Sequence, residues 1–271
     1  MCLPGRTLAL VISVGWIGTP VRGADQTLYP VADGTIVDGG TFGVRDGNPD
    51  RADWYFNESS FDGVITLSRF SAAPIEQRVI FEFDLRNVSL AAPVTATLTF
   101  SLRGTTRFPA ESAPVALYVY PANAAENLSD FSAGPASLVM VASVAPFQPK
   151  TAYRVNVSRW VNEMRSAQQI AIGFRTQIDA QSPHAADQAF MDVLDSDVAT
   201  KPVMRITDRV PGDFNQDRLV NRDDFSILAA CLDGPEIPVP STCTVCDLDF
   251  DSDVDMYDVG SFLEFQTLYR P

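Results

Sequence analysis

Apolar and polar residues alternate along much of the chain between Asp25 and Asp208. The pattern is clearest at residues 79–85, 96–102, 115–120 and 170–175. A period of two is typical of a β-strand with one face in a core. We expect further strands at 27–31, 64–69, 137–144, 152–157, 188–193 and 202–207. About ten strands predict a two-sheet antiparallel sandwich, and they favour a jelly roll among such sandwiches.

One segment of this region has helical spacing instead. Over residues 158–167, Trp160, Val161 and Met164 fall on one face, and Ser158 is expected to cap the helix. A single short helix argues against a parallel α/β fold, which needs a helix between successive strands. Residues 24–210 are therefore predicted to be a mainly β domain.

The order of these strands resembles that of a known family. The segments that carry the resemblance are Arg78–Leu85, Val94–Phe100, Val115–Tyr120, Tyr153–Ser158 with its short helix, and Lys201–Ile206. They are similar to DNRLRE-type domains, secreted bacterial jelly-roll modules that resemble carbohydrate-binding modules. The stretch Asp33–Gly40 departs from the usual opening strand of that family.

The pattern and the charge both change after the turn Val210-Pro211-Gly212. Residues 211–271 hold 13 of the 34 acidic residues but only 3 of the 20 basic ones, and the chain carries a net charge of -14. Such acidity argues against nucleic-acid binding, which needs a positive field, and favours cation binding. We expect a separate domain at 211–271.

This domain contains a repeated run of oxygen-bearing residues. Its first loop, Asp213–Asp224, places them at positions one, three, five, nine and twelve: Asp213, Asn215, Asp217, Asn221 and Asp224. The same positions recur 34 residues later as Asp247, Asp249, Asp251, Asp255 and Asp258. Position seven is Leu219 in the first copy, where a backbone carbonyl can serve, and Asp253 in the second. This is the spacing of EF-hand-type loops, which wrap calcium in six to eight oxygens.

A solvated charge run is the alternative interpretation of these acids. It gives no reason for the spacing to be kept in two copies, each followed by an apolar helical stripe. We expect those stripes at Phe225, Leu228, Ala229 and Leu232, and at Val259, Phe262 and Leu263. The sequence therefore predicts two calcium ions and a paired loop–helix domain.

One loop and one helix per repeat, with Asp at position twelve, resembles type I dockerins. The resemblance implies docking onto a cohesin-like protein or a cell-surface scaffold. It also implies that loop positions ten and eleven contact the partner, namely Arg222 and Asp223 in one copy and Met256 and Tyr257 in the other. Position six is Arg218 or Ser252 where a glycine is usual, so we expect a strained turn in both loops.

The N-terminus predicts the compartment. Residues 1–23 combine Arg6, an apolar run and small residues before Ala24, the pattern of a secretory signal peptide, and no later stretch has the length of a membrane span. Cys2 lies within the signal peptide, so the secreted chain keeps Cys231, Cys243 and Cys246. In a secreted chain these predict one disulfide, from Cys231 to Cys243 or Cys246.

The sequence leaves three alternatives for the sandwich: a carbohydrate-binding module, an enzyme, or a structural surface protein with no glycan ligand. Trp54 and Tyr55 lie beside Asp53, a group suited to stacking on a sugar and binding its hydroxyls, although neighbouring aromatics on a strand often belong to a core. No catalytic residues can be nominated, since His184 is the only histidine. We expect a secreted, non-catalytic carbohydrate-binding protein that docks onto an extracellular polysaccharide-degrading or cell-surface assembly. The alternative is a polysaccharide lyase or glycoside hydrolase delivered by the same docking domain.

Overall fold

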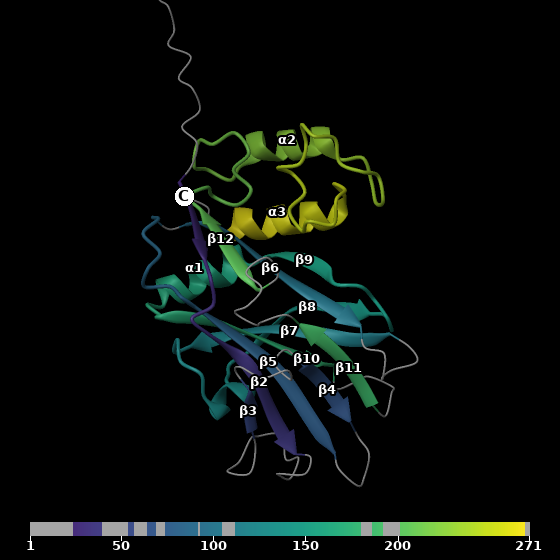
Figure 1. The fold of residues 1–271 in the computed structure, drawn as a ribbon. Coiled ribbons are helices and arrows are strands. Elements are labelled where there is room, and N and C mark those ends of the chain that lie inside the picture. Colours follow the sequence, from purple (N-terminus) through teal and green to yellow (C-terminus); the bar gives the residue numbers. More distant parts are fainter. Residues whose placement is uncertain are drawn as a thin grey trace, which may run out of the picture.

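The computed structural model describes residues 24–39, 54–56, 64–68, 74–91, 93–104, 112–179, 186–191 and 201–268. A large β-structure forms most of the molecule, and a small helical unit rests on one end of it (Figure 1). Among the described helices, none has both the length and the apolar character needed to cross a bilayer.

Twelve strands build the β-part of the described chain. Their bounds are β1 Asp25–Leu28, β2 Ala32–Gly39, β3 Trp54–Phe56, β4 Val64–Ser68, β5 Ile75–Asp84, β6 Thr95–Gly104, β7 Ala113–Ala122, β8 Ser137–Val144, β9 Thr151–Asn156, β10 Ala171–Ile178, β11 Ala186–Met191 and β12 Val203–Thr207. The only helical elements in this part are η1 (Leu128–Phe131) and α1 (Ser158–Ser166). The expected mainly β class is confirmed.

Hydrogen bonds join the strands in the order β1-β12-β6-β11-β4-β5-β10-β7-β8. Off this path, β2 pairs with β5 and with β3, and β9 pairs with β6. All of these pairs are antiparallel. The path folds into two layers, because alternate residues of β5 and of β6 enter one buried core. Phe81 and Phe83 of β5 meet Leu98 and Phe100 of β6 in that core. The architecture is a two-layer sandwich.

The opening of the sandwich differs from the prediction. The strand expected at 27–31 lies at Asp25–Leu28, and β2 occupies Ala32–Gly39, where no strand was predicted. Most of β2 is buried on both faces, so its sequence lacks alternation. The cause is η1, whose Leu128 and Phe131 pack on Ile36 from outside the sandwich.

Helix α1 ties one edge of the sandwich together. Val161 is fully buried, and Trp160 and Met164 pack against the core as predicted. The prediction that Ser158 caps the helix is wrong: Val157 is the capping residue, and it makes no side-chain bond. The Ser158 hydroxyl instead accepts the Ala96 N–H at 2.9 Å and so holds α1 onto β6.

The C-terminal unit consists of two loops and two helices, α2 (Arg222–Cys231) and α3 (Met256–Leu268). Its core is small and centres on Leu228 and Phe262, with Val220 and Val254 contributed by position eight of the two loops. A disulfide joins Cys231 to Cys243, which are 12 residues apart, and Cys246 is a buried free thiol.

The predicted apolar stripes of these helices are partly wrong. Phe225, Ala229 and Leu263 are exposed, whereas Phe265 is buried. The reason is that Asp224 and Asp258, at position twelve, are themselves fully buried. Residues four and seven positions after a buried residue lie on the same face of a helix, so they are buried with it. Ala229 and Leu263 lie five positions after these aspartates and therefore face outward.

Candidate metal centre

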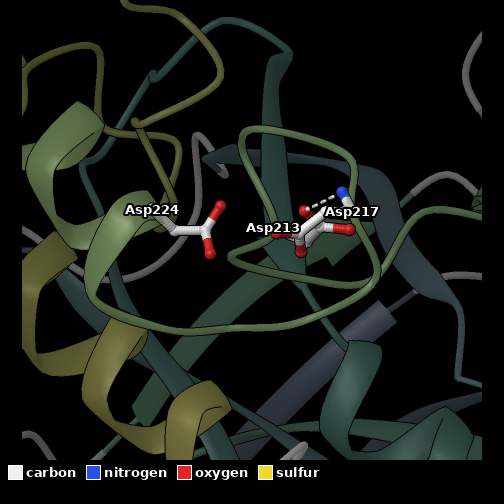
Figure 2. A group of neighbouring side chains, drawn as sticks. All are labelled: Asp213, Asp217 and Asp224. Carbon is white, nitrogen blue, oxygen red and sulfur yellow. Dashed lines mark hydrogen bonds between the residues drawn. The ribbon is translucent and has the colours of Figure 1, made fainter.

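The first loop gathers three carboxylates around one point. Oxygen atoms of Asp213, Asp217 and Asp224 all lie within 4.8 Å of one another. Figure 2 shows Asp213 and Asp217 on the loop, with Asp224 facing them from the start of α2. The backbone N–H of Asp217 donates to Asp213 Oδ1 at 3.1 Å. The loop is thus wrapped around its own first residue.

The backbone reaches this shape through left-handed residues. Positions four and six have positive φ in both loops, with 64° at Gln216 and 69° at Arg218, and 67° at Phe250 and 80° at Ser252. Each such non-glycine residue costs about 1–2 kcal/mol. The expected strain at position six is present in both copies, and position four shares it.

Positions nine and twelve connect each loop to its helix. Asn221 Oδ1 accepts the Asp223 N–H at 2.7 Å, while Asp224 Oδ2 accepts the Asn221 N–H at 3.0 Å. The second copy repeats both bonds: Asp255 Oδ1 accepts the Tyr257 N–H, and Asp258 Oδ2 accepts the Asp255 N–H. Such reciprocal caps start a helix at a fixed place. They hold the position-twelve carboxylate directly beneath the loop.

The second loop gathers more carboxylates than the first. Two overlapping groups, Asp247 with Asp249 and Asp258, and Asp253 with Asp255 and Asp258, each bring their oxygens within 4.8 Å. Asp247 Oδ1 and Asp253 Oδ1 are buried and have no hydrogen-bond partner among the described residues. A buried carboxylate oxygen without a donor is costly unless a cation satisfies it.

The remaining predicted ligands lie in the same two loops but outside these carboxylate groups. Asn215 Oδ1 accepts the Asp217 N–H at 2.9 Å, and Asp251 Oδ1 accepts the Asp253 N–H at 3.2 Å. The backbone N–H of Leu219 donates to Asp217 Oδ1 at 2.8 Å, which leaves its carbonyl as the group for a ligand role. The other oxygen of Asp253 accepts the Glu236 N–H at 2.6 Å.

Crowding changes the acidity of these groups. Burial, and then the charges of Asp258 and Asp251, raise the pKa of Asp249 to about 7. Burial is also the main cause of the raised pKa of Asp213, Asp247 and Asp258. A bound divalent cation would reverse this penalty by supplying the opposite charge. The donor set is made of oxygens, which suits a hard ion such as calcium.

The four predicted partner residues lie at the outer starts of the two helices. Met256 is 71% exposed and Tyr257 74% exposed, so neither packs against the sibling repeat. Arg222 and Asp223 are exposed at the equivalent place on α2. The two copies therefore present different surfaces, one charged and the other apolar and aromatic.

The predicted sugar contacts are placed only by their backbone. In β3, Trp54 pairs with Val37 and Tyr55 with Ile36 of β2, and their side chains lie outside the described residues. His184 and the predicted signal peptide at 1–23 also lie outside them.

Sequence analysis missed a buried polar cluster beneath η1, on the outer face of the β5–β10–β7 layer. Tyr120 donates a hydrogen bond from its hydroxyl to Glu82 at 3.0 Å, and Glu82 is fully buried. Arg175 Nη1 donates to the Asp130 carbonyl at 3.1 Å. Burial and the charge of Asp130 raise the pKa of Glu82 to about 7. The cluster binds η1 to the sheet, and alternation alone gave no sign that the polar face of these strands is covered.

Comparison with known proteins adds only distant likenesses, among solved structures. No protein-family model and no curated protein matches the sequence. Among solved structures, a xylan-binding module, CBM15, is 11% identical over 69% of this chain and 97% of the module, with a TM-score of 0.36. Identity and overlap at this level transfer no ligand or activity to this chain.

Proposed function

We propose that the protein is a secreted, calcium-dependent docking protein in which a dockerin-like unit carries a carbohydrate-binding sandwich of jelly-roll type. The observation that carries the docking part is the exact correspondence between the two loops. Both place carboxylates around a point, both use positions four and six in the left-handed region, and both cap a helix with positions nine and twelve. Two copies of one cation-wrapping geometry support a function that depends on calcium.

Partner docking is supported by the exposed start of α3. Large apolar and aromatic side chains are costly to leave in water and are common anchors of protein interfaces. Met256 and Tyr257 stand next to Asp255 and Asp258, so calcium would fix the direction in which they project. We propose that they form the main contact with a cohesin-like partner, in a single binding mode.

Calcium binding is tested by titrating the full chain, stripped of metal, by calorimetry. We expect two ions per chain, and none in the variant Asp213→Ala/Asp247→Ala. Partner contact is tested next, with purified cohesin modules in the presence of calcium. Met256→Ala/Tyr257→Ala should weaken binding at least tenfold, while Arg222→Ala/Asp223→Ala changes it little. Equal small losses would show two interchangeable modes and contradict the proposal.

Carbohydrate binding by the sandwich rests on the Trp54–Tyr55 pair and on the resemblance to DNRLRE-type domains. A glycan array read with the full chain and with Trp54→Ala tests it, with the exposed Phe147→Ala as the control for loss of an aromatic elsewhere. A reducing-sugar assay and an assay for unsaturated products run on the same glycans would detect the alternative, a glycoside hydrolase or polysaccharide lyase. Steady product release that survives repurification would establish the alternative.

A further inference from the structure

The C-terminal unit contacts the sandwich through its second loop and α3. In Figure 1, α3 lies between α2 and the sandwich, close to α1 and the ends of the strands. Arg159 of α1 pairs with Glu264 of α3, with 2.5 Å between Nη1 and Oε1. Arg154 of β9 lies over the ring of Phe250, 4.6 Å from its centroid. The loop that faces the sandwich is thus the one with the more crowded carboxylates.

One peptide group of this loop is held from both sides. The carbonyl of Leu248 accepts a hydrogen bond from Asn156 Nδ2 at 3.3 Å. The N–H of the same peptide group belongs to Asp249 and donates to Asp258 Oδ1 at 3.4 Å. Asp258 is the position-twelve ligand, so a residue of the sandwich orients a peptide that in turn orients a ligand. Hydrogen bonds in such a chain polarise and strengthen one another.

Asn156 is itself firmly placed. Its Oδ1 accepts the Ser158 N–H at 3.1 Å and the Ser158 hydroxyl at 2.6 Å. Ser158 is fully buried and bonded to Ala96. Because these acceptor bonds fix the amide plane, its Nδ2 can point only toward the loop. In the first loop, the equivalent position is Phe214. Phe214, Leu248 and Asn156 all border a cavity of about 410 Å³ between the units.

We propose that Asn156 is a positioning residue for the second calcium loop, and that the sandwich thereby raises the calcium affinity of that loop. The proposal rests on calcium binding as the function of these loops. It requires the loop to be held more tightly by the sandwich with calcium than without it. Linkage is reciprocal, so calcium strengthens the docking of the two units by the same factor. The C-terminal unit is then held more tightly on the sandwich when calcium is bound.

The test uses the full chain with the first loop disabled by Asp213→Ala/Asp217→Ala, so that calorimetry reports the second loop alone. In this background, Asn156→Ser removes the amide that donates to the Leu248 carbonyl. The hydroxyl of the introduced serine can still accept the Ser158 N–H, as serine side chains do in turns. We expect calcium affinity to fall about twofold to tenfold, the equivalent of one net hydrogen bond. The matched control is Asn87→Ser, on an exposed turn of the sandwich, which should leave the affinity unchanged.

A second variant separates contact from charge. Arg154→Met removes a positive charge near the loop. Loss of that charge by itself favours calcium binding, so a fall in affinity must come from the lost contact with Phe250. Thermal melting in chelator provides the other readout: the Asn156→Ser and parent proteins should melt alike there and differ only with calcium. Unchanged affinity in Asn156→Ser, or an equal loss of stability with and without calcium, would overturn the proposal. A parent that binds no calcium at the second loop would overturn the proposed function as well.

Discussion

The sandwich and the C-terminal unit both bury carboxylates, but they do so in opposite ways. In the sandwich, Glu82 lies under η1 with the hydroxyl of Tyr120 as its donor, and Arg175 spans the same cluster. In the C-terminal unit, Asp247, Asp249 and Asp258 face one another. The sandwich therefore places a neutral hydroxyl and a guanidinium of its own beside its buried carboxyl, although Glu82 Oε2 and Arg175 Nε have no hydrogen-bond partner among the described residues. The C-terminal unit leaves part of the negative charge of these carboxylates unbalanced, and we propose that a bound cation balances it.

Calcium removal should separate the two regions most strongly. With a chelator, we expect the protection of α2 and α3 in hydrogen exchange to be lost while the strands stay protected. The reason is that ten carboxylates in the two loops repel one another, and the small core beneath them cannot offset this cost. Exchange measured with and without calcium checks it. Unchanged protection of α2 and α3 would mean that the unit balances its own charge, and would remove the contrast.

The disulfide should matter only to the C-terminal unit. Cys231→Ser/Cys243→Ser opens a loop of 12 residues, which corresponds to about 2–3 kcal/mol of lost stability for that unit. Denaturant unfolding followed by a probe in each region measures the effect. The buried free thiol provides the control, since Cys246→Ala leaves the loop closed. An equal shift in the sandwich transition would show that the two units unfold together.

Two glycines test packing in the two regions. A Cβ at Gly173 would lie 2.4 Å from a ring carbon of Tyr120, whose hydroxyl is bonded to Glu82. Gly173→Ala should therefore destabilise the sandwich by about 1–3 kcal/mol. Gly260 in α3 has nothing within 4 Å of its Cβ position, so Gly260→Ala should stabilise that helix by about 0.5–1 kcal/mol. Thermal unfolding of both variants measures these changes in stability. If Gly173→Ala leaves the stability unchanged, the ring of Tyr120 can move aside.

The stability of the sandwich should also depend on pH. Burial raises the pKa of Glu82 from 4.5 to about 7, so the folded state holds its proton where the unfolded state has lost it. The contribution is present below pH 4.5 and declines as the pH rises toward 7. Melting temperatures measured across this window should fall less in Glu82→Gln than in the parent. The exposed Glu163→Gln should follow the parent, and an identical profile for Glu82→Gln would contradict the raised pKa.

The sequence was informative where function depends on local spacing. The grouping of the loop carboxylates, the position-six strain and the two helices all follow from short segments, because each loop is built from neighbouring residues. The helix stripes were misjudged at Ala229 and Leu263, since the pattern was assigned from apolar residues alone. Asp224 and Asp258 are polar yet buried, and they set which face turns inward.

Long-range features could not be predicted in the same way. Glu82, Tyr120, Asp130 and Arg175 come from four elements, and only the folded sheet brings them under η1. The strand β2 was missed because its outer face is covered by η1, so alternation was absent. The contact between Asn156 and Leu248 joins residues 92 positions apart and depends on how two units meet. Such features need the tertiary structure.

The place of β12 has a mechanical consequence. It is the last strand before the C-terminal unit, and it is bonded on one side to β1 and on the other to β6. Just beyond it, the hydroxyl of Thr95 in β6 donates to the carbonyl of Arg209 at 2.9 Å. When the C-terminal unit is pulled along the axis of β12, the ladders on both flanks are loaded in shear, and their hydrogen bonds must break together rather than one by one. The joint between the two units thus resists tension at the point where the load enters the sandwich.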